Sequence, residues 1–187
     1  MKILHVITSL RTGGAEKLMV DMLPRMNALG VEVDLCVFDG VRTPFYEELE
    51  KKGVRIISLG TSVYSPFNIL RLLKLMRKYD VVHTHNTACQ YYAAIAGLWT
   101  KCKKITTEHN TTNRRRQKRG WLFWDRWMYG RYDKVICISK ETRENLLHFL
   151  CDVNAVCVND KYVAIYNGID VANYASLNHV SNTGNEH

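Results

Sequence analysis

Residues 2–16 of the chain read KILHVITSLRTGGAE, and this stretch predicts the fold. An apolar run fills residues 2–8 and predicts a β-strand. The glycine pair Gly13-Gly14 follows, and the segment 16–29 after it places apolar side chains on one stripe at helical spacing. A strand, a glycine turn and an amphipathic helix in this order are typical of the first unit of a parallel α/β sheet.

The alternation of strand and helix continues along the chain. Further strands are predicted at 31–38, 54–59, 80–84, 103–107, 134–138 and 162–166. Helices are predicted at 16–29, 44–52, 66–78, 87–100 and 139–150. Gly30 and Gly53 are expected to end the first two helices, Pro24 is expected to kink the first, and Ser139 is expected to cap the last.

This alternation predicts the fold class. Strands that alternate with helices pair in parallel through right-handed crossovers. The sequence therefore predicts an α/β fold with a doubly wound, mostly parallel, Rossmann-like sheet and helices on both faces. In such a sheet, ligands meet the loops at the carboxyl ends of the strands, where the strand order reverses.

Composition places the chain among ordinary soluble domains. Its 187 residues suit one domain with its own core, and hydrophobic residues make up 47%. The apolar start is too short for a signal peptide, and no apolar run approaches the roughly 20 residues of a membrane-spanning helix. The six cysteines form no C-x-x-C pair and have no metal-ligand spacing with a histidine. We therefore expect a cytoplasmic protein with reduced thiols.

The glycine pair is the first candidate binding element. Gly13 and Gly14, followed by Ala15 and Glu16, would allow positive φ and a close approach of the backbone, and the helix N-terminus offers N–H groups to an anion. A plain tight turn is equally compatible with this loop. The fingerprint G-x-G-x-x-G and the P-loop lysine motif are both absent, which disfavours a Rossmann dehydrogenase or a nucleotide triphosphatase.

Two further strands end in polar residues. His83 and His85 lie two apart and so share a face of the sheet, and Asn86 follows them. A paired-histidine metal site is one interpretation, but no nearby carboxylate or cysteine completes it, so structural histidines are favoured. His109-Asn110 end the next strand, where a histidine can bind a hydroxylated ligand or act as an acid or base. Three polar strand ends at one edge favour a site there.

Five segments, in order, resemble the amino-terminal domain of glycosyltransferase family 4, a group of retaining enzymes with the two-domain GT-B fold. They are residues 2–6 leading into 13–16, then 80–85, 107–110, 135–139 and 165–170. Each segment is a weak signal alone, but their order and spacing make the set fairly specific.

The resemblance implies an activity. In this family the amino-terminal domain binds mainly the acceptor, and the carboxyl-terminal domain binds the nucleotide-sugar donor. This chain would supply the acceptor-binding half for retaining transfer from a nucleotide sugar to a saccharide or lipid-linked acceptor, as in cell-envelope polysaccharide biosynthesis. Residues 1–168 would form the Rossmann-like domain, and residues 169–187 a linker or truncated end toward an absent donor-binding domain. The chain alone would then be inactive. The family usually needs no cofactor or metal, so none is expected.

The resemblance also implies roles for single residues. The loop from Gly13 to Glu16 would lie close to the donor diphosphate when the domains close. His109 matches the histidine that contacts the transferred sugar, and it would orient that sugar while the leaving phosphate deprotonates the acceptor. The remaining residues expected in the crevice are His85, Asn86, Asn110 and Ser139.

A basic and aromatic segment follows the fifth predicted strand. Its cations are Arg114, Arg115, Arg116, Lys118 and Arg119, in a chain of net charge +8. We expect this block in a loop that faces an anionic acceptor or an anionic membrane, which would place the protein peripherally on the inner face of the membrane. A solvated helix face is the alternative. Trp124, Trp127 and Met128 are expected to pack onto the sheet in a crossover helix.

The predicted fold is compatible with two other classes of function. A non-catalytic α/β module that binds a sugar or an anion would have the same fold. Binding of nucleic acid through the arginine block is disfavoured, because the sequence has neither a recognition-helix pattern nor an aromatic sheet platform.

Overall fold

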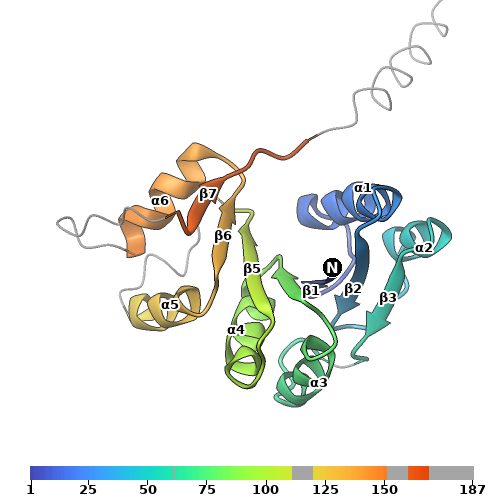
Figure 1. Ribbon diagram of the computed structural model, residues 1–187, viewed down its shortest axis with the longest axis horizontal. Helices are drawn as coiled ribbons and strands as arrows, with labels where there is room; N and C mark the ends of the chain where they lie inside the picture. Colours follow the sequence, from blue (N-terminus) through green and yellow to red (C-terminus); the bar gives the residue numbers. More distant parts are fainter. Residues whose placement is uncertain (61, 111–119, 151–159, 169–187) are drawn as a thin grey trace, which may run out of the picture.

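The structure of the chain, a computed structural model, describes residues 1–60, 62–110, 120–150 and 160–168 (Figure 1). The strands are β1 (Lys2–Ile7), β2 (Glu32–Val37), β3 (Arg55–Ser58), β4 (Val81–Thr84), β5 (Lys103–Glu108), β6 (Lys134–Cys137) and β7 (Tyr162–Ala164). The helices are α1 (Gly14–Ala28), α2 (Pro44–Lys51), α3 (Phe67–Met76), α4 (Thr87–Ala96), α5 (Trp121–Gly130) and α6 (Lys140–Leu150), with a short 3₁₀ helix η1 (Gly97–Trp99).

These strands form one sheet in the order β3-β2-β1-β4-β5-β6-β7. Each strand pairs in parallel with its neighbours. The order reverses between β1 and β4, so this pair is the switch point of a doubly wound sheet. The predicted fold class is confirmed, and every predicted strand is present with bounds within two residues of those expected.

The described helices divide between the two faces of the sheet (Figure 1). α1 and α2 share one core cluster with Ile3 and Ile7 of β1. α3 and α4 share another with Leu4 and Val6, on the opposite face, and α5 and α6 extend that side over β6. Because side chains alternate along a strand, His5 points to the same face as Ile3 and Ile7.

The helix ends follow the predicted glycines. Gly30 and Gly53 have φ of 81° and 77° just after α1 and α2, which are left-handed conformations that favour glycine. Pro24 lies inside α1, which continues on both sides of it.

The glycine pair at the start of α1 does not use the positive φ that glycine allows. Neither Gly13 nor Gly14 has a positive φ, and Gly13 is extended, with φ of −174°. The physical reason is that Gly13 is the N-cap of α1, and an N-cap residue takes up β-region backbone angles.

α5 is a crossover helix, but one of its tryptophans points to solvent. Met128 is buried and Trp127 packs against the same cluster, as predicted. Trp124 is 54% exposed, so the prediction that it packs onto the sheet was wrong. The buried stripe begins instead at Asp125, whose Oδ1 accepts a hydrogen bond of 2.5 Å from the hydroxyl of Tyr91 on α4.

Four cysteines lie within the described residues, all four are buried, and none of them is in a disulfide: Cys36, Cys89, Cys102 and Cys137. Burial raises the pKa of Cys36 to about 12, so its thiol stays protonated and packs as a small apolar group. None of the described helices combines the length and hydrophobicity needed to cross a membrane.

Candidate active site

Four histidines gather where β1, β4 and β5 approach their carboxyl ends. His5 lies in β1 and His83 in β4, and the parallel register of these strands places the two directly opposite each other. His85 directly follows β4, and His109 directly follows β5. His83 and His85 share a face as predicted, with ring centroids 4.3 Å apart.

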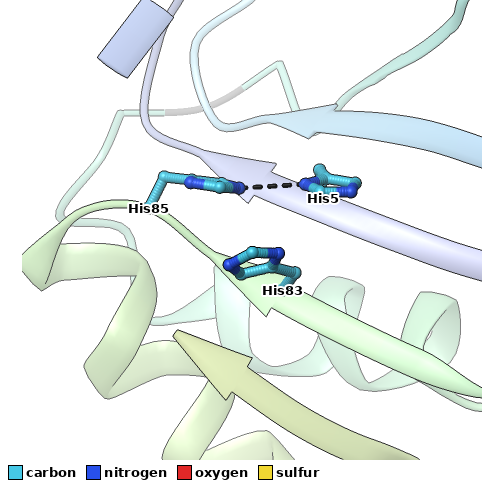
Figure 2. A group of neighbouring side chains, drawn as sticks. All are labelled: His5, His83 and His85. Carbon is cyan, nitrogen blue, oxygen red and sulfur yellow. Dashed lines mark hydrogen bonds between the residues drawn. The ribbon is translucent and has the colours of Figure 1, made fainter. Parts of the chain in front are cut away.

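Three of the four imidazoles form a line of hydrogen bonds. Nδ1 of His5 lies 2.9 Å from Nε2 of His85. The dashed line in Figure 2 marks this hydrogen bond. Nδ1 of His85 lies 3.3 Å from Nε2 of His109. His85 therefore uses both ring nitrogens and connects the fully buried His5 to the partly exposed His109.

His83 packs beside this line (Figure 2). Its ring centroid lies 4.9 Å from that of His5, and the two rings are tilted by 41°. Its Nε2 lies 2.7 Å from the hydroxyl oxygen of Thr107 in β5. His83 thus links β4 to β5 within the cluster and lies outside the line of hydrogen bonds.

Burial keeps these imidazoles uncharged. It lowers the pKa of His5 to about 3 and the pKa of His109 to about 4. The pKa values of His83 and His85 also lie well below the ordinary value, first because of burial and second because neighbouring histidines would repel a charge. At neutral pH the cluster therefore consists of neutral rings, each with one N–H donor and one acceptor nitrogen.

His5 is the member of the cluster that sequence reasoning missed. It lies between Leu4 and Val6 in an apolar strand and resembles a core position. The available signal was a polar ring inside a buried strand. Its meaning depends on the pairing of β1 with β4, which sets His5 against His83.

The cluster also includes a possible set of metal ligands. One nitrogen from each of His5, His83 and His85 lies within 4.8 Å of the others, and neutral imidazole is a good ligand for Zn²⁺. Within the described chain this group contains no carboxylate or thiolate. Both ring nitrogens of His85 already take part in hydrogen bonds, one with His5 and one with His109, so a metal ion bound by His85 would have to break one of these bonds. The expectation that no metal is needed stays a prediction.

Two of the predicted crevice residues support the scaffold. The Oδ1 atom of Asn86 accepts a hydrogen bond of 3.1 Å from the N–H of Thr8, which ties the end of β1 to the start of α4. The Oγ atom of Ser139 accepts a 3.0 Å bond from the N–H of Thr142, which confirms the predicted N-cap of α6. Asn110 is exposed beside His109. Ligand contacts by these three predicted residues stay predictions.

The glycine loop is open on one side and covered on the other. A Cβ atom built on Gly14 would meet nothing within 4 Å, so the described chain leaves room for a ligand there. A Cβ atom on Gly13 would lie only 2.3 Å from a carboxylate oxygen of Glu16. The Glu16 side chain thus folds back over the helix N-terminus, where the helix dipole favours a negative charge. Ala15, in the first turn of α1, packs against the core on this face of the sheet.

A cavity of about 390 Å³ lies beside the histidines on the α1 face. α1 lines it from Leu18 to Leu29, and the segment 165–168 lines it too. The sheet contributes residues near the carboxyl ends of β4, β5 and β6: His83, His85, Thr107 and Ile136. This agrees with the prediction of a crevice beyond the switch point.

Two predicted segments lie outside the described residues. The block Arg114, Arg115, Arg116, Lys118 and Arg119 falls within residues 111–119, and the expected linker falls within residues 169–187. Their predicted roles therefore stay predictions.

The fold is that of the amino-terminal domain of two-domain GT-B glycosyltransferases, as comparison with solved structures shows. The HepE protein of Anabaena, solved with UDP and glucose, aligns with 100% of this chain at a TM-score of 0.74 and 16% identity. A glycosyltransferase from Rickettsia africae ESF-5 aligns with 95% of it at a TM-score of 0.74 and 24% identity. The chain belongs to glycosyltransferase family 4, whose family model matches residues 12–173. The resemblance seen in the sequence motifs is confirmed.

A curated relative is similar over a shorter stretch. The capsular polysaccharide biosynthesis glycosyltransferase CapH of Staphylococcus aureus is 34% identical over 86 residues, which are 46% of this chain and 24% of CapH. The chain spans 51% of the HepE chain and 45% of the Rickettsia chain. It therefore corresponds to about half of the length of the two solved proteins.

The neutral cluster predicts that the chain loses stability in mild acid. Below a pH of about 6.5 the unfolded chain takes up protons on His5, His83 and His85 that the folded chain excludes, so the free energy of unfolding falls as the pH falls toward the lowered native pKa values. Each buried histidine should cost about 1 kcal/mol between pH 7 and about pH 5.5. Urea unfolding at the two pH values measures this loss.

The variant His83→Leu should reduce that pH-dependent loss by about 1 kcal/mol, because it removes one of the sites. The matched control is His148→Leu, which removes an exposed ring on α6 that lies outside the cluster. Equal pH dependence in the wild type and His83→Leu would contradict the assignment of neutral buried rings.

Proposed function

We propose that this chain is the acceptor-binding half of a retaining glycosyltransferase that moves a sugar from a nucleotide-sugar donor to a saccharide or lipid-linked acceptor. The observation that carries the proposal is the contact between His85 and His109 beside the switch point, in a chain of family 4. HepE was solved with UDP and glucose, which supports the donor class. CapH is named for capsular polysaccharide biosynthesis, which supports a saccharide or lipid-linked acceptor.

The proposal includes the division of the protein into domains. Residues 1–168 form the acceptor-binding domain, and residues 169–187 lead toward a donor-binding domain. Alignment with only about half of each solved glycosyltransferase supports this division. A transfer reaction between two substrates needs both domains, so we expect the 187-residue chain to be inactive by itself.

In this proposal His109 orients the transferred sugar and is not the base. Its lowered pKa, about 4, means that the ring is uncharged at neutral pH and only weakly basic. A neutral imidazole is well suited to hold a sugar hydroxyl through a hydrogen bond. The leaving diphosphate then takes the proton of the acceptor, and no metal or cofactor is required.

The N-terminus of α1 is the proposed place for the donor diphosphate. Its backbone N–H groups and dipole favour an anion, and Gly14 is open to approach. The Glu16 carboxylate must turn away from Gly13 when a diphosphate binds, because two negative groups cannot share the position. The flexible glutamate side chain allows that movement.

The alternative is a non-catalytic module that binds a sugar or an anion with the same residues. It differs from the enzyme in one measurable respect: it would bind a nucleotide sugar without cleaving it. The family membership and the relatives favour the enzyme.

A screen of the complete two-domain protein against nucleotide sugars tests the proposed activity. We expect slow hydrolysis of one donor in the absence of acceptor, measured as release of the nucleotide.

His109→Ala should lower kcat by about a hundredfold, since a misplaced sugar loses its orientation toward the reacting atoms. His148→Ala, a substitution of an exposed histidine on α6, is the matched control. Full turnover by His109→Ala would refute the role of His109, and donor binding without hydrolysis would favour the module.

Gly14→Ala separates the proposed diphosphate site from a mere turn. The added methyl group meets nothing in the described chain, so the free energy of unfolding in urea should stay within about 0.5 kcal/mol of that of the wild type. In the complete protein the methyl group should obstruct the donor and raise KM for the nucleotide sugar about tenfold. An unchanged KM would mean that Gly14 serves only to start helix α1.

We also propose a peripheral contact with the inner face of an anionic membrane, in a cytoplasmic protein. α5 supports it, because Trp121, Phe123 and Trp124 are 42%, 70% and 54% exposed and directly follow the basic block in the sequence. Aromatic rings beside basic residues suit the headgroup region of a bilayer. Such a contact would bring the enzyme close to a lipid-linked acceptor.

Vesicle sedimentation at low salt tests this contact. We expect stronger binding to anionic than to neutral vesicles and a severalfold loss of binding when all three aromatic residues are replaced by serine. The replacement of exposed Tyr64 by serine is a control that removes an aromatic ring elsewhere on the surface. Equal binding to both kinds of vesicle would contradict the membrane proposal.

A further inference from the structure

The buried His5 has no explained role in the proposed function. It is 1% exposed and lies in the middle of β1, so it cannot touch a substrate in the crevice. A polar ring in an apolar strand is costly unless its nitrogens are hydrogen-bonded. Nδ1 of His5 bonds to His85, whereas Nε2 has no hydrogen-bond partner among the described residues.

The line from His5 through His85 to His109 couples the protonation patterns of the three rings. A neutral imidazole carries one proton, so one nitrogen donates and the other accepts. In both bonds of the line an Nδ1 atom faces an Nε2 atom. If His85 donates from Nδ1 to His109, its Nε2 must accept from Nδ1 of His5. The three rings must therefore all carry the proton on Nδ1 or all carry it on Nε2.

The buried end of the line distinguishes these two arrangements. With all protons on Nε2, His5 would hold an N–H group in the interior with no acceptor in the described chain. With all protons on Nδ1, His5 instead holds an unpaired acceptor nitrogen there. Unpaired buried N–H groups are rarer in folded proteins than under-used acceptors, so the second arrangement is favoured.

We propose that His85 and His5 are positioning residues that hold His109 in the tautomer with its proton on Nδ1, so that His109 donates a hydrogen bond from Nδ1 to an oxygen of the transferred sugar. The donation to a sugar rests on the proposed function, whereas the tautomer itself does not. Free histidine favours the Nε2–H tautomer, so the line selects the form that is less common in water.

This arrangement has a consequence for the substrate. A fixed donor recognises a hydroxyl through the oxygen lone pairs, and a sugar that lacks this hydroxyl leaves the N–H of His109 unpaired in a partly buried site. Sites built to bond one hydroxyl discriminate strongly against the deoxy analogue. In this proposal the orientation of the sugar therefore depends on the two rings that lie behind His109.

Nitrogen NMR of the histidine side chains tests the tautomers directly. The 187-residue chain, labelled with ¹⁵N at both ring nitrogens of histidine, is recorded at about pH 7 without donor. We expect His5, His85 and His109 all to show a protonated Nδ1 and an unprotonated Nε2. A wild-type spectrum with the proton of His109 on Nε2, or with different tautomers in His5 and His109, would overturn the proposal.

Variants of His85 test whether the line sets the tautomer of His109. His85→Leu removes both bonds, so the Nδ1–H form of His109 should fall to a mixture with the Nε2–H form. His85→Asn places an amide donor near the former Nδ1 position and should restore much of the Nδ1–H form. His83→Leu is the matched control, since His83 is in the cluster but outside the line, and it should leave His109 unchanged. Retention of the pure Nδ1–H form in His85→Leu would refute the positioning role.

Addition of Zn²⁺ distinguishes this role from metal binding. The proposal expects no stoichiometric change in the histidine spectrum, because the facing nitrogens of His5 and His85 are bonded to each other. Tight binding of one equivalent that His83→Leu abolishes would overturn the proposal in favour of a metal site. If the complete protein shows the expected tautomers but transfers no sugar, the proposed function is refuted. The proposed tautomers of His5, His85 and His109 are then still supported.

Discussion

β1 and β4 pair in parallel at the centre of the sheet, although two strands and three helices separate them in the chain. The site depends on this pairing. It sets His5 opposite His83, and the pairing of β4 with β5 then brings His85 to His109. The strand order reverses at the same pair, so the loops after β1 and β4 diverge and leave space between them. A shift of one residue in the β1–β4 register would move His5 away from His83. It would also turn the buried side chains of β1 to the opposite face of the sheet.

Burial determines what this cluster can do. In water an imidazole titrates near neutral pH and is a versatile acid or base. Inside this sheet, desolvation makes the charged form unfavourable, so the rings act as directional donors and acceptors. In the proposed transfer the leaving phosphate takes the proton of the acceptor, so His109 does not have to act as a base. His109 instead needs a fixed orientation, and its buried hydrogen-bond partners are suited to provide one.

The surroundings of the site combine rigid and open parts. The bond from Thr8 to Asn86 ties the two strand ends at the switch point, and the cap at Ser139 fixes the start of α6. The cavity next to the histidines lies under α1, on the face opposite the cluster that α5 and α6 build. Gly14 lies at the exposed N-terminus of α1, where no described atom lies within 4 Å of the position of a Cβ atom. The structure thus leaves open space at a polar rim, while the rings beneath it are held by the sheet.

The sequence alone determined the α/β class, the strands, the helix-ending glycines Gly30 and Gly53 and the family, because hydrophobic period, turn chemistry and motif order are local properties of the chain. It also predicted that His85 and His109 lie at one edge, since carboxyl ends of parallel strands meet there. Only the tertiary structure decided that His5 belongs with them, that Gly13 is extended and that Trp124 is exposed. Those outcomes depend on which distant strands pair and on which turn of α5 reaches the core, and both are set by contacts between segments far apart in the sequence.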